Sequence, residues 1–277
     1  KLQEPAADGI LPMTSNIMKL LCLSAFLAIT ASLQAQMKVA ALHPLLGDIA
    51  AQVGGTHVNV ANLLRPGMDA HHFEPTAEDL ANIKGVRVVL ASGKGLESYL
   101  DKLRDSLGGV SVVEVGKTIP DRKIDPSEDL EHDDDDHDKD GDKHEDHHHH
   151  GSQDPHWWHS MDNMKRATRI IAEAFSAADP ANKDAYKANA AAAAQRIADL
   201  KSWAQQQFLT IPAEDRKLVT AHSAFGYFCK EFGFQSISIL GLAREDQVTP
   251  KYLIAALTVL RAFHVAGVAD SGTTAFF

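Results

Sequence analysis

A tract near the middle of the chain, Asp129 to His150, constrains folding more than any other part of the sequence. It holds seven histidines and eleven carboxylates, and Leu130 is its single apolar residue. Such a segment cannot bury enough apolar surface to offset the entropy of ordering, so we expect a disordered loop. The folded parts of the chain must therefore lie before and after it.

The tract has the composition of a weak binder of divalent metals. Imidazole nitrogens favour zinc, copper and nickel, whereas carboxylate oxygens favour harder cations, so a loop with both can hold such ions in several arrangements. A purification tag explains the tract less well, because it is internal and its histidines are interleaved with acids. We expect weak accessory metal sites at its histidines, which are His132, His137, His144, His147, His148, His149 and His150.

The net charge of the chain is concentrated in the same tract. Eleven carboxylates and two lysines give the tract a charge of −9, out of a formal −10 for the whole chain. The remainder is nearly neutral, so the overall acidity says nothing about binding partners. We expect no nucleic acid among them.

The residues before the first strand have the composition of a secretory signal peptide. Lys19 precedes an apolar run from Leu20 to Ala31, and Ala35 is a small residue at a candidate cleavage site. The run is too short to span a bilayer. We expect export to the periplasm, with a buried helix at the start of the domain as the alternative. Cys229 is then the only cysteine of the mature chain, and we expect it to be a small core residue without a disulfide.

Strand and helix patterns alternate on both sides of the tract, which favours an α/β fold. A break at Asp179 and Pro180 separates two helices after the tract, and the second would extend about 40 Å at 1.5 Å per residue. That helix is long enough to cross a domain. We expect strands at 37–42, 58–64, 86–91, 110–115, 217–220 and 236–240, and helices at 45–53, from 76, and at 97–107, 160–177, 181–207, 223–231 and 251–263.

Three histidine-bearing turns follow strand candidates or precede helices. They run from Pro66 to Pro75, from Asp154 to His159 and from Thr220 to Tyr227. Ligands of open α/β sheets lie outside the carboxyl ends of the strands, where the first and third of these turns are expected. One histidine in such a loop is usually structural, but three beside a metal-attracting tract favour a metal site.

The same turns carry a specific resemblance. The strings PGMDAHHFEPT, DPHWWHSMDNMKR and TAHSAFGYF resemble the three ligand-bearing motifs of the periplasmic zinc-binding proteins of ATP-binding-cassette importers, the cluster A-I metal-binding family. The similarity runs from about Met37 to Asp270, and the acidic histidine-rich loop is itself typical of zinc members. Matched motif by motif, the family's ligands fall on His71, His156 and His222, which leaves His72 and His159 as neighbours.

The resemblance implies two α/β lobes joined by one long rigid helix, with the metal held in the cleft between them. It implies a monomeric binding protein, not an enzyme, that passes its metal to an ABC importer permease in the inner membrane. The corresponding division is upstream residues and signal peptide 1–35, N-terminal lobe 36–128, His/Asp-rich loop 129–153, second-ligand segment and long helix 154–210, and C-terminal lobe 211–277, which we expect to be truncated.

Three imidazoles with one open position match tetrahedral Zn²⁺, whereas manganese sites contain more oxygen. Manganese members of the family have a glutamate where this chain has His222. The family's last ligand, an aspartate, would lie beyond Phe277. Three alternatives stay open: a binding protein for manganese or another divalent metal, a periplasmic metal buffer that depends on the tract alone, and a zinc hydrolase. The hydrolase is the weakest, because no HExxH motif falls on an expected helix.

Overall fold

The computed structural model describes residues 35–122 and 153–240. The chain divides into two compact units, Lys1–Ala35 and Gln36–Phe277, and every helix and strand given below belongs to the second. The expected signal peptide, the tract Asp129 to His150 and the helix at 251–263 lie outside the described residues. No helix in the described ranges is both long and apolar enough to cross a membrane.

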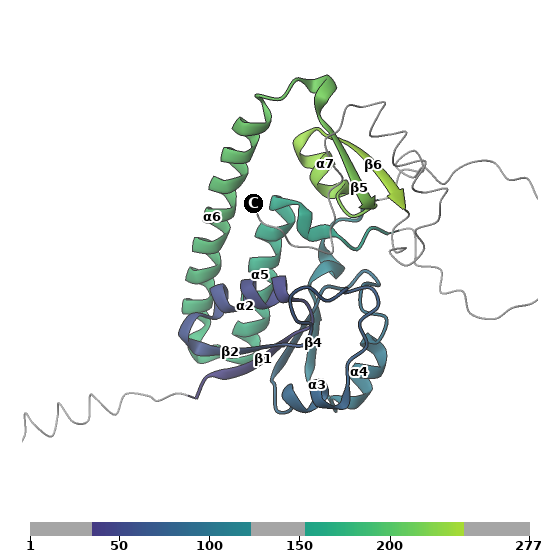
Figure 1. Cartoon of the computed structure of the whole chain (residues 1–277). Coiled ribbons are helices and arrows are strands. Elements are labelled where there is room, and N and C mark those ends of the chain that lie inside the picture. The colour runs from purple at the N-terminus through teal and green to yellow at the C-terminus, as the bar shows by residue number, and fades with distance from the viewer. Residues whose placement is uncertain (1–34, 123–152, 241–277) are drawn as a thin grey trace, which may run out of the picture. The chain divides into compact units, whose positions relative to one another are not determined.

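The first lobe is built on a four-stranded parallel sheet. Its strands are β1 (Met37–Ala41), β2 (Val58–Asn62), β3 (Val88–Ala91) and β4 (Ser111–Glu114), in the order β2-β1-β3-β4. The helices α2 (Pro44–Gly54), α3 (Ala77–Asn82) and α4 (Leu100–Ser106) connect them in turn (Figure 1). Thr76 and Asp79 form a reciprocal capping box at the start of α3, as the sequence predicts.

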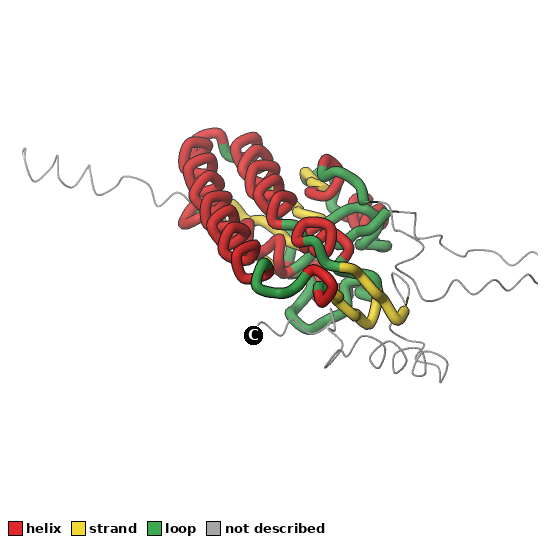
Figure 2. The backbone as a smooth tube through the Cα atoms, turned by 90° about the horizontal axis from the view of Figure 1, so that it is seen from above, coloured by secondary structure: helices red, strands yellow, loops and turns green. Residues whose placement is uncertain are grey.

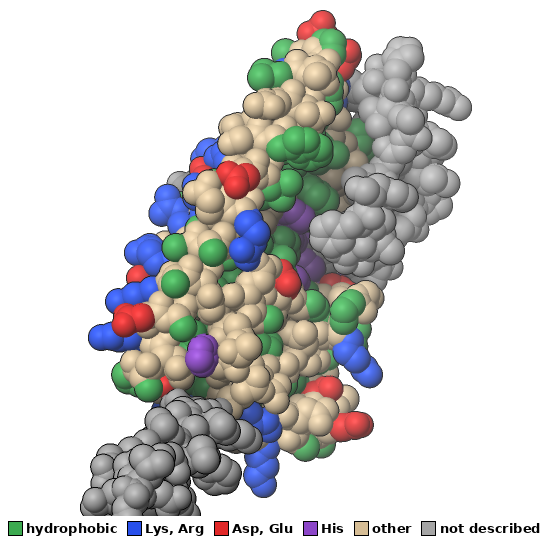
Figure 3. Space-filling model, turned by 90° about the vertical axis from the view of Figure 1, so that its left-hand side faces the viewer, with side chains coloured by type: hydrophobic (Ala, Val, Ile, Leu, Met, Phe, Trp, Pro, Cys, Tyr) green, Lys and Arg blue, Asp and Glu red, His purple; other side chains and the backbone are tan. Residues whose placement is uncertain are grey.

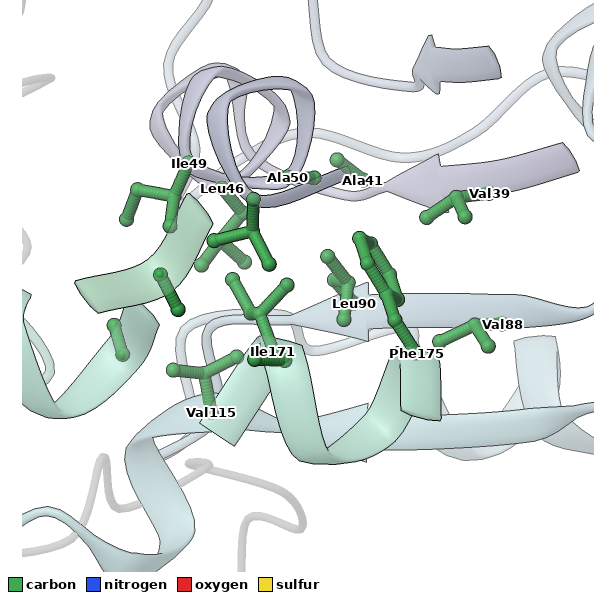
Figure 4. Close-up of a cluster of buried hydrophobic side chains, with 14 of the residues drawn as sticks. Val39, Ala41, Leu46, Ile49, Ala50, Val88, Leu90, Val115, Ile171 and Phe175 are labelled. Carbon is green, nitrogen blue, oxygen red and sulfur yellow. The ribbon is translucent and has the colours of Figure 1, made fainter. Parts of the chain in front are cut away.

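Both faces of this sheet are buried. Along β1, Val39 and Ala41 point into one apolar cluster and Ala40 into another. The first cluster lies between the sheet, α2 and α5 and includes Leu90 and Phe175 (Figure 4). A strand that is buried on both faces needs apolar residues at successive positions, which explains the continuous apolar runs in the sequence.

Two helices lead from the first lobe to the second. Helix α5 (Met161–Ala178) covers one face of the first sheet, and α6 (Lys183–Phe208) follows after a short 3-10 turn at Pro180–Asn182. At 1.5 Å per residue, α6 extends about 39 Å. Figures 1 and 2 show α5 and α6 side by side, with α6 continuing past the end of α5.

The second lobe, as far as the structure describes it, consists of two parallel strands and one helix. Strands β5 (Lys217–His222) and β6 (Gln235–Leu240) pair along their length, and α7 (Gly226–Phe232) crosses between them. Gly233 ends α7 with a φ of +73°, a conformation that glycine adopts without strain. The predicted order of α/β lobe, long helix and α/β lobe is confirmed, and the described elements lie within a few residues of their predicted bounds.

Candidate metal centre

Three histidines that are far apart in the sequence meet at one place. Ring nitrogens of His71, His156 and His222 all lie within 4.8 Å of one another. The Nε2 atoms of His71 and His156 are 3.1 Å apart, and the ring centroids of the three pairs are separated by 5.1, 5.7 and 5.3 Å. Figure 3 shows histidine side chains set among apolar side chains on one face of the molecule. The structure thus brings together the three candidates that the sequence analysis selected.

His71 is placed by the turn that follows β2. The carboxylate of Asp69 accepts a hydrogen bond from the backbone N–H of His71 at 2.9 Å, which fixes the turn. The other carboxylate oxygen of Asp69 contacts the ring of His72, which is exposed to solvent. His72 therefore lies beside the centre and outside the group of three, as expected.

His156 is held from behind by a buried carboxylate. Asp154 Oδ1 accepts from the backbone N–H of His156 at 2.9 Å and lies 2.8 Å from its Nδ1. With Nδ1 as the donor, the lone pair of Nε2 faces His71. Arg122 donates to the other oxygen of Asp154 at 3.1 Å. Burial opposes the charge of Asp154, but these hydrogen bonds and the Arg122 charge lower its pKa, so the carboxylate is charged at neutral pH.

The two tryptophans after His156 have different roles. Trp157 is fully buried in the first lobe, and its Nε1 donates to the carbonyl oxygen and hydroxyl of Ser92 at 3.2 and 3.0 Å. Its role is that of a packing anchor. Trp158 is half-buried and has its ring 5.4 Å from that of His156 and 4.9 Å from that of His43. Trp158 therefore forms part of the wall of the centre.

The turn that holds Trp157 is supported by a buried glutamate. Both oxygens of Glu97 accept backbone N–H groups, from Ser92 at 2.6 Å and from Gly93 at 2.9 Å. Burial raises the pKa of Glu97 to about 7 despite these hydrogen bonds. The loop after β3, and with it the position of Trp157, thus depends on one carboxylate.

Burial keeps imidazoles in this region neutral. Desolvation, followed by the charges of neighbouring histidines, lowers the pKa of His71 to about 3 and that of His159 to about 3. The same two causes lower the pKa of His43 to about 4. A histidine must be neutral to donate a lone pair to a metal, so His71 is ready to bind a cation at neutral pH without first losing a proton.

The spacing of the nitrogens fits a small tetrahedral cation. With Zn–N bonds near 2.0–2.1 Å, tetrahedral geometry separates ligand nitrogens by about 3.3 Å. The 3.1 Å between Nε2 of His71 and Nε2 of His156 is close to this separation. Within the described ranges, the group that can converge on one ion contains three histidines and no carboxylate. The expected accessory histidines and the expected fourth ligand lie outside those ranges.

The sequence analysis missed several residues that support the centre. Asp154 belonged to a quoted motif but received no role, although an aspartate two residues before a histidine is a recognisable signal for an Asx turn. Arg122 carried no such signal, because its partner Asp154 is 32 positions away. Glu97 has its partners within five residues, but it belonged to none of the quoted motifs. His159 lies against Phe225, with ring centroids 4.3 Å apart, which agrees with its expected place as a neighbour.

Comparison with known proteins places the chain among metal-binding proteins. Residues 39–269 match the family model "Zinc-uptake complex component A periplasmic". The manganese-binding lipoprotein MntA of Halalkalibacterium halodurans is 28% identical over 77% of this chain, and that of Bacillus subtilis is 30% identical over 76%. The chain spans 64% and 63% of the lengths of these two relatives.

Solved structures of other proteins have the same fold. The periplasmic zinc-binding protein TroA from Treponema pallidum superposes with a TM-score of 0.70 at 22% identity, over 85% of this chain and 78% of that one. At this identity the likeness concerns the fold. It confirms the two-lobe α/β architecture.

Proposed function

The chain belongs to the zinc-uptake complex component A family. We propose that it captures a divalent metal ion and delivers it to an ABC-type importer, with zinc as the preferred candidate for the ion. The ion is cargo, and the protein is a binding protein, not an enzyme. His71, His156 and His222 are the proposed ligands. The observation that carries the proposal is the convergence of their ring nitrogens within 4.8 Å.

The chemistry of the donors favours zinc over manganese. Three imidazole nitrogens form a borderline-soft set that suits zinc, copper and nickel, whereas manganese is usually held with more oxygen. The support of His156 by the carboxylate of Asp154 is the arrangement that orients imidazole ligands and raises their basicity. Copper and nickel share the preference for imidazole, so selection against them would depend on metal supply.

Manganese is the second candidate, and the names of the relatives favour it. Two relatives quoted above are named manganese-binding lipoproteins. A fourth ligand with a carboxylate would move the donor set toward manganese. Relative affinity does not separate the two cargoes, because a site of nitrogen and oxygen donors generally holds Zn²⁺ more tightly than Mn²⁺. They are separable by the metal that the chain carries when it is purified from cells grown with both ions.

Binding of zinc to the purified chain tests the proposal. Calorimetry in competition with a chelator is expected to show one tight site per chain. His156→Ala should remove that site, whereas His57→Ala, which alters a histidine packed against Tyr186, should leave it unchanged. Tight one-to-one binding that survives in His156→Ala would contradict the ligand assignment.

Location, partner and domain division belong to the same proposal. We place the protein in the periplasm after removal of a signal peptide, as a monomer that presents both lobes to a permease. The division into residues 1–35, 36–128, 129–153, 154–210 and 211–277 is proposed with it. The histidines from His132 to His150 would collect metal weakly beside the tight site.

A further inference from the structure

Arg122 lies where the two lobes of the chain meet. Its side chain is buried, with 7% of its surface exposed, and its Nε donates to Asp154 Oδ2 at 3.1 Å. Its backbone carbonyl accepts from the backbone N–H of Asp154 at 3.3 Å. Arg122 therefore fixes both the backbone and the carboxylate of the residue that orients His156.

The guanidinium of Arg122 also rests against the start of α7 in the second lobe. A Cβ atom added to Gly226 would lie 1.4 Å from Nη2 of Arg122 and 1.8 Å from its Cζ. Only a residue without a side chain permits this approach. The guanidinium cannot simply move aside, because it is buried and paired with a carboxylate that is itself fully buried.

A second contact ties the same two segments together. The hydroxyl of Tyr227 accepts from the backbone N–H of Arg122 at 3.0 Å and donates to the carbonyl of Pro120 at 3.1 Å. Tyr227 belongs to α7, which begins four residues after His222. The helix that follows one proposed ligand is thus bonded to the segment that supports another.

We propose that Arg122 is a positioning residue of the metal centre, which holds the Asp154 and His156 pair at a fixed place relative to the helix that follows His222. This inference rests on the proposed function. His156 and His222 come from different lobes, so their separation is fixed only if the segments behind them are joined. Arg122 joins these segments, because its guanidinium contacts Gly226 and its backbone N–H donates to Tyr227. Opening of this contact would separate two ligands and release the ion.

Gly226→Ala tests the contact between the Arg122 guanidinium and Gly226 without altering a proposed ligand. The new methyl group displaces Arg122, so zinc affinity should fall about tenfold or more, as it does when groups that orient metal ligands are removed. Arg122→Ala supplies the double-mutant cycle, because a shorter polar side chain such as glutamine would still place an atom near the Nε position, 2.2 Å from the added Cβ. With the guanidinium absent, the methyl group has nothing to displace, and Gly226→Ala should then change affinity less than about twofold. An equal loss in both backgrounds would overturn the proposal.

Tyr227→Phe tests the second contact, and it tests the positioning role of Arg122 even if the other variants do not fold. It removes one oxygen atom, and the rate of zinc release to a chelator should rise about threefold or more. Tyr186→Phe is the matched control, since Tyr186 is also buried and donates to Asp179 near the junction of α5 and α6. Its release rate should not change. Equal release rates in the two variants would contradict the inference.

These outcomes separate the inference from the proposed function. If His156→Ala keeps the tight zinc site, the ligand assignment is wrong and the positioning role falls with it. If His156→Ala loses the site while Gly226→Ala and Tyr227→Phe behave like the native chain, the function stands and the positioning role is wrong. Thermal unfolding of the metal-free variants shows whether any loss of affinity comes from unfolding.

Discussion

The Nε2 atoms of His71 and His156 lie 3.1 Å apart, although 85 positions separate the two residues in the chain. Both rings are placed by aspartates that accept backbone N–H groups, Asp69 for His71 and Asp154 for His156. Each aspartate precedes its histidine by two residues. The same local arrangement therefore positions two of the proposed ligands, which come from unrelated turns.

Asp154→Asn should weaken zinc binding without unfolding the chain. The amide keeps the shape of the side chain but loses the charge that stabilises the Nδ1 hydrogen bond of His156. The expected loss of affinity is about 10–100-fold. Chelator competition measures it. Asp162→Asn is the control, because Asp162 pairs with Lys201 and Lys165 and contacts no proposed ligand.

The metal-free chain should lose stability as the pH falls from 6.5 toward 4. The folded-state pKa values of His43, His71 and His159 are lowered to about 4, 3 and 3, so between these values and 6.5 the unfolded chain binds more protons. Their contribution is fully present above pH 6.5 and is lost as protons bind. Denaturant unfolding across this range measures the slope, and a stability that is flat from pH 7 to 4 would contradict the burial of these rings.

Protonation of Glu97 should partly offset this loss of stability at low pH. Its folded pKa is raised to about 7 from 4.5, so between these values the folded chain retains a proton that the unfolded chain has lost. Its contribution is therefore present below pH 4.5 and is lost as the pH rises to 7. Glu97→Gln removes the titration, and the loss of stability from pH 7 to 4.5 should become steeper than in the native chain.

Phe175→Ala should destabilise the first lobe by about 3–5 kcal/mol, because it leaves a cavity in a close-packed core. The Phe175 side chain has 0% of its surface exposed and packs between α5 and the sheet (Figure 4). Trp203→Ala on α6 is the comparison, since 58% of Trp203 is exposed, and it should change the free energy of unfolding by less than about 0.5 kcal/mol. Denaturant titration of both variants measures the difference.

Replacement of Asp129 to His150 by a short Gly/Ser linker should leave the tight zinc site intact. The residues that converge on the proposed ion lie outside that tract. The weaker class of binding should disappear with the seven histidines. Calorimetry distinguishes the two classes. Loss of the tight site with the tract would instead support a metal buffer.

Most of the fold could be predicted because its signals are local. The run from Val86 to Ala91 indicates a strand buried on both faces, and Asp179 with Pro180 marks the break between α5 and α6. The candidate histidines could be selected because each lies in a turn of distinctive composition. The roles of Asp69 and Asp154 could have been predicted for the same reason.

The supporting contacts could not be predicted, because they depend on tertiary structure. Nothing near Arg122 in the sequence indicates that its guanidinium rests on Gly226, and nothing near Glu97 indicates that it is buried. The ring of Tyr227 is buried like that of a core residue, but its hydroxyl also bonds to two backbone groups of the first lobe. Long-range pairs of this kind leave no periodic pattern in a single sequence.

The residues on either side of the gap from 123 to 152 are bonded to each other. Asp154 donates its backbone N–H to Arg122, and the side chain of Gln153 donates to Asp121. The cost of closing a loop between ends that are already joined rises only slowly with its length. The length of the chain between Arg122 and Gln153 can therefore vary at little cost to the fold of the described residues on either side of it.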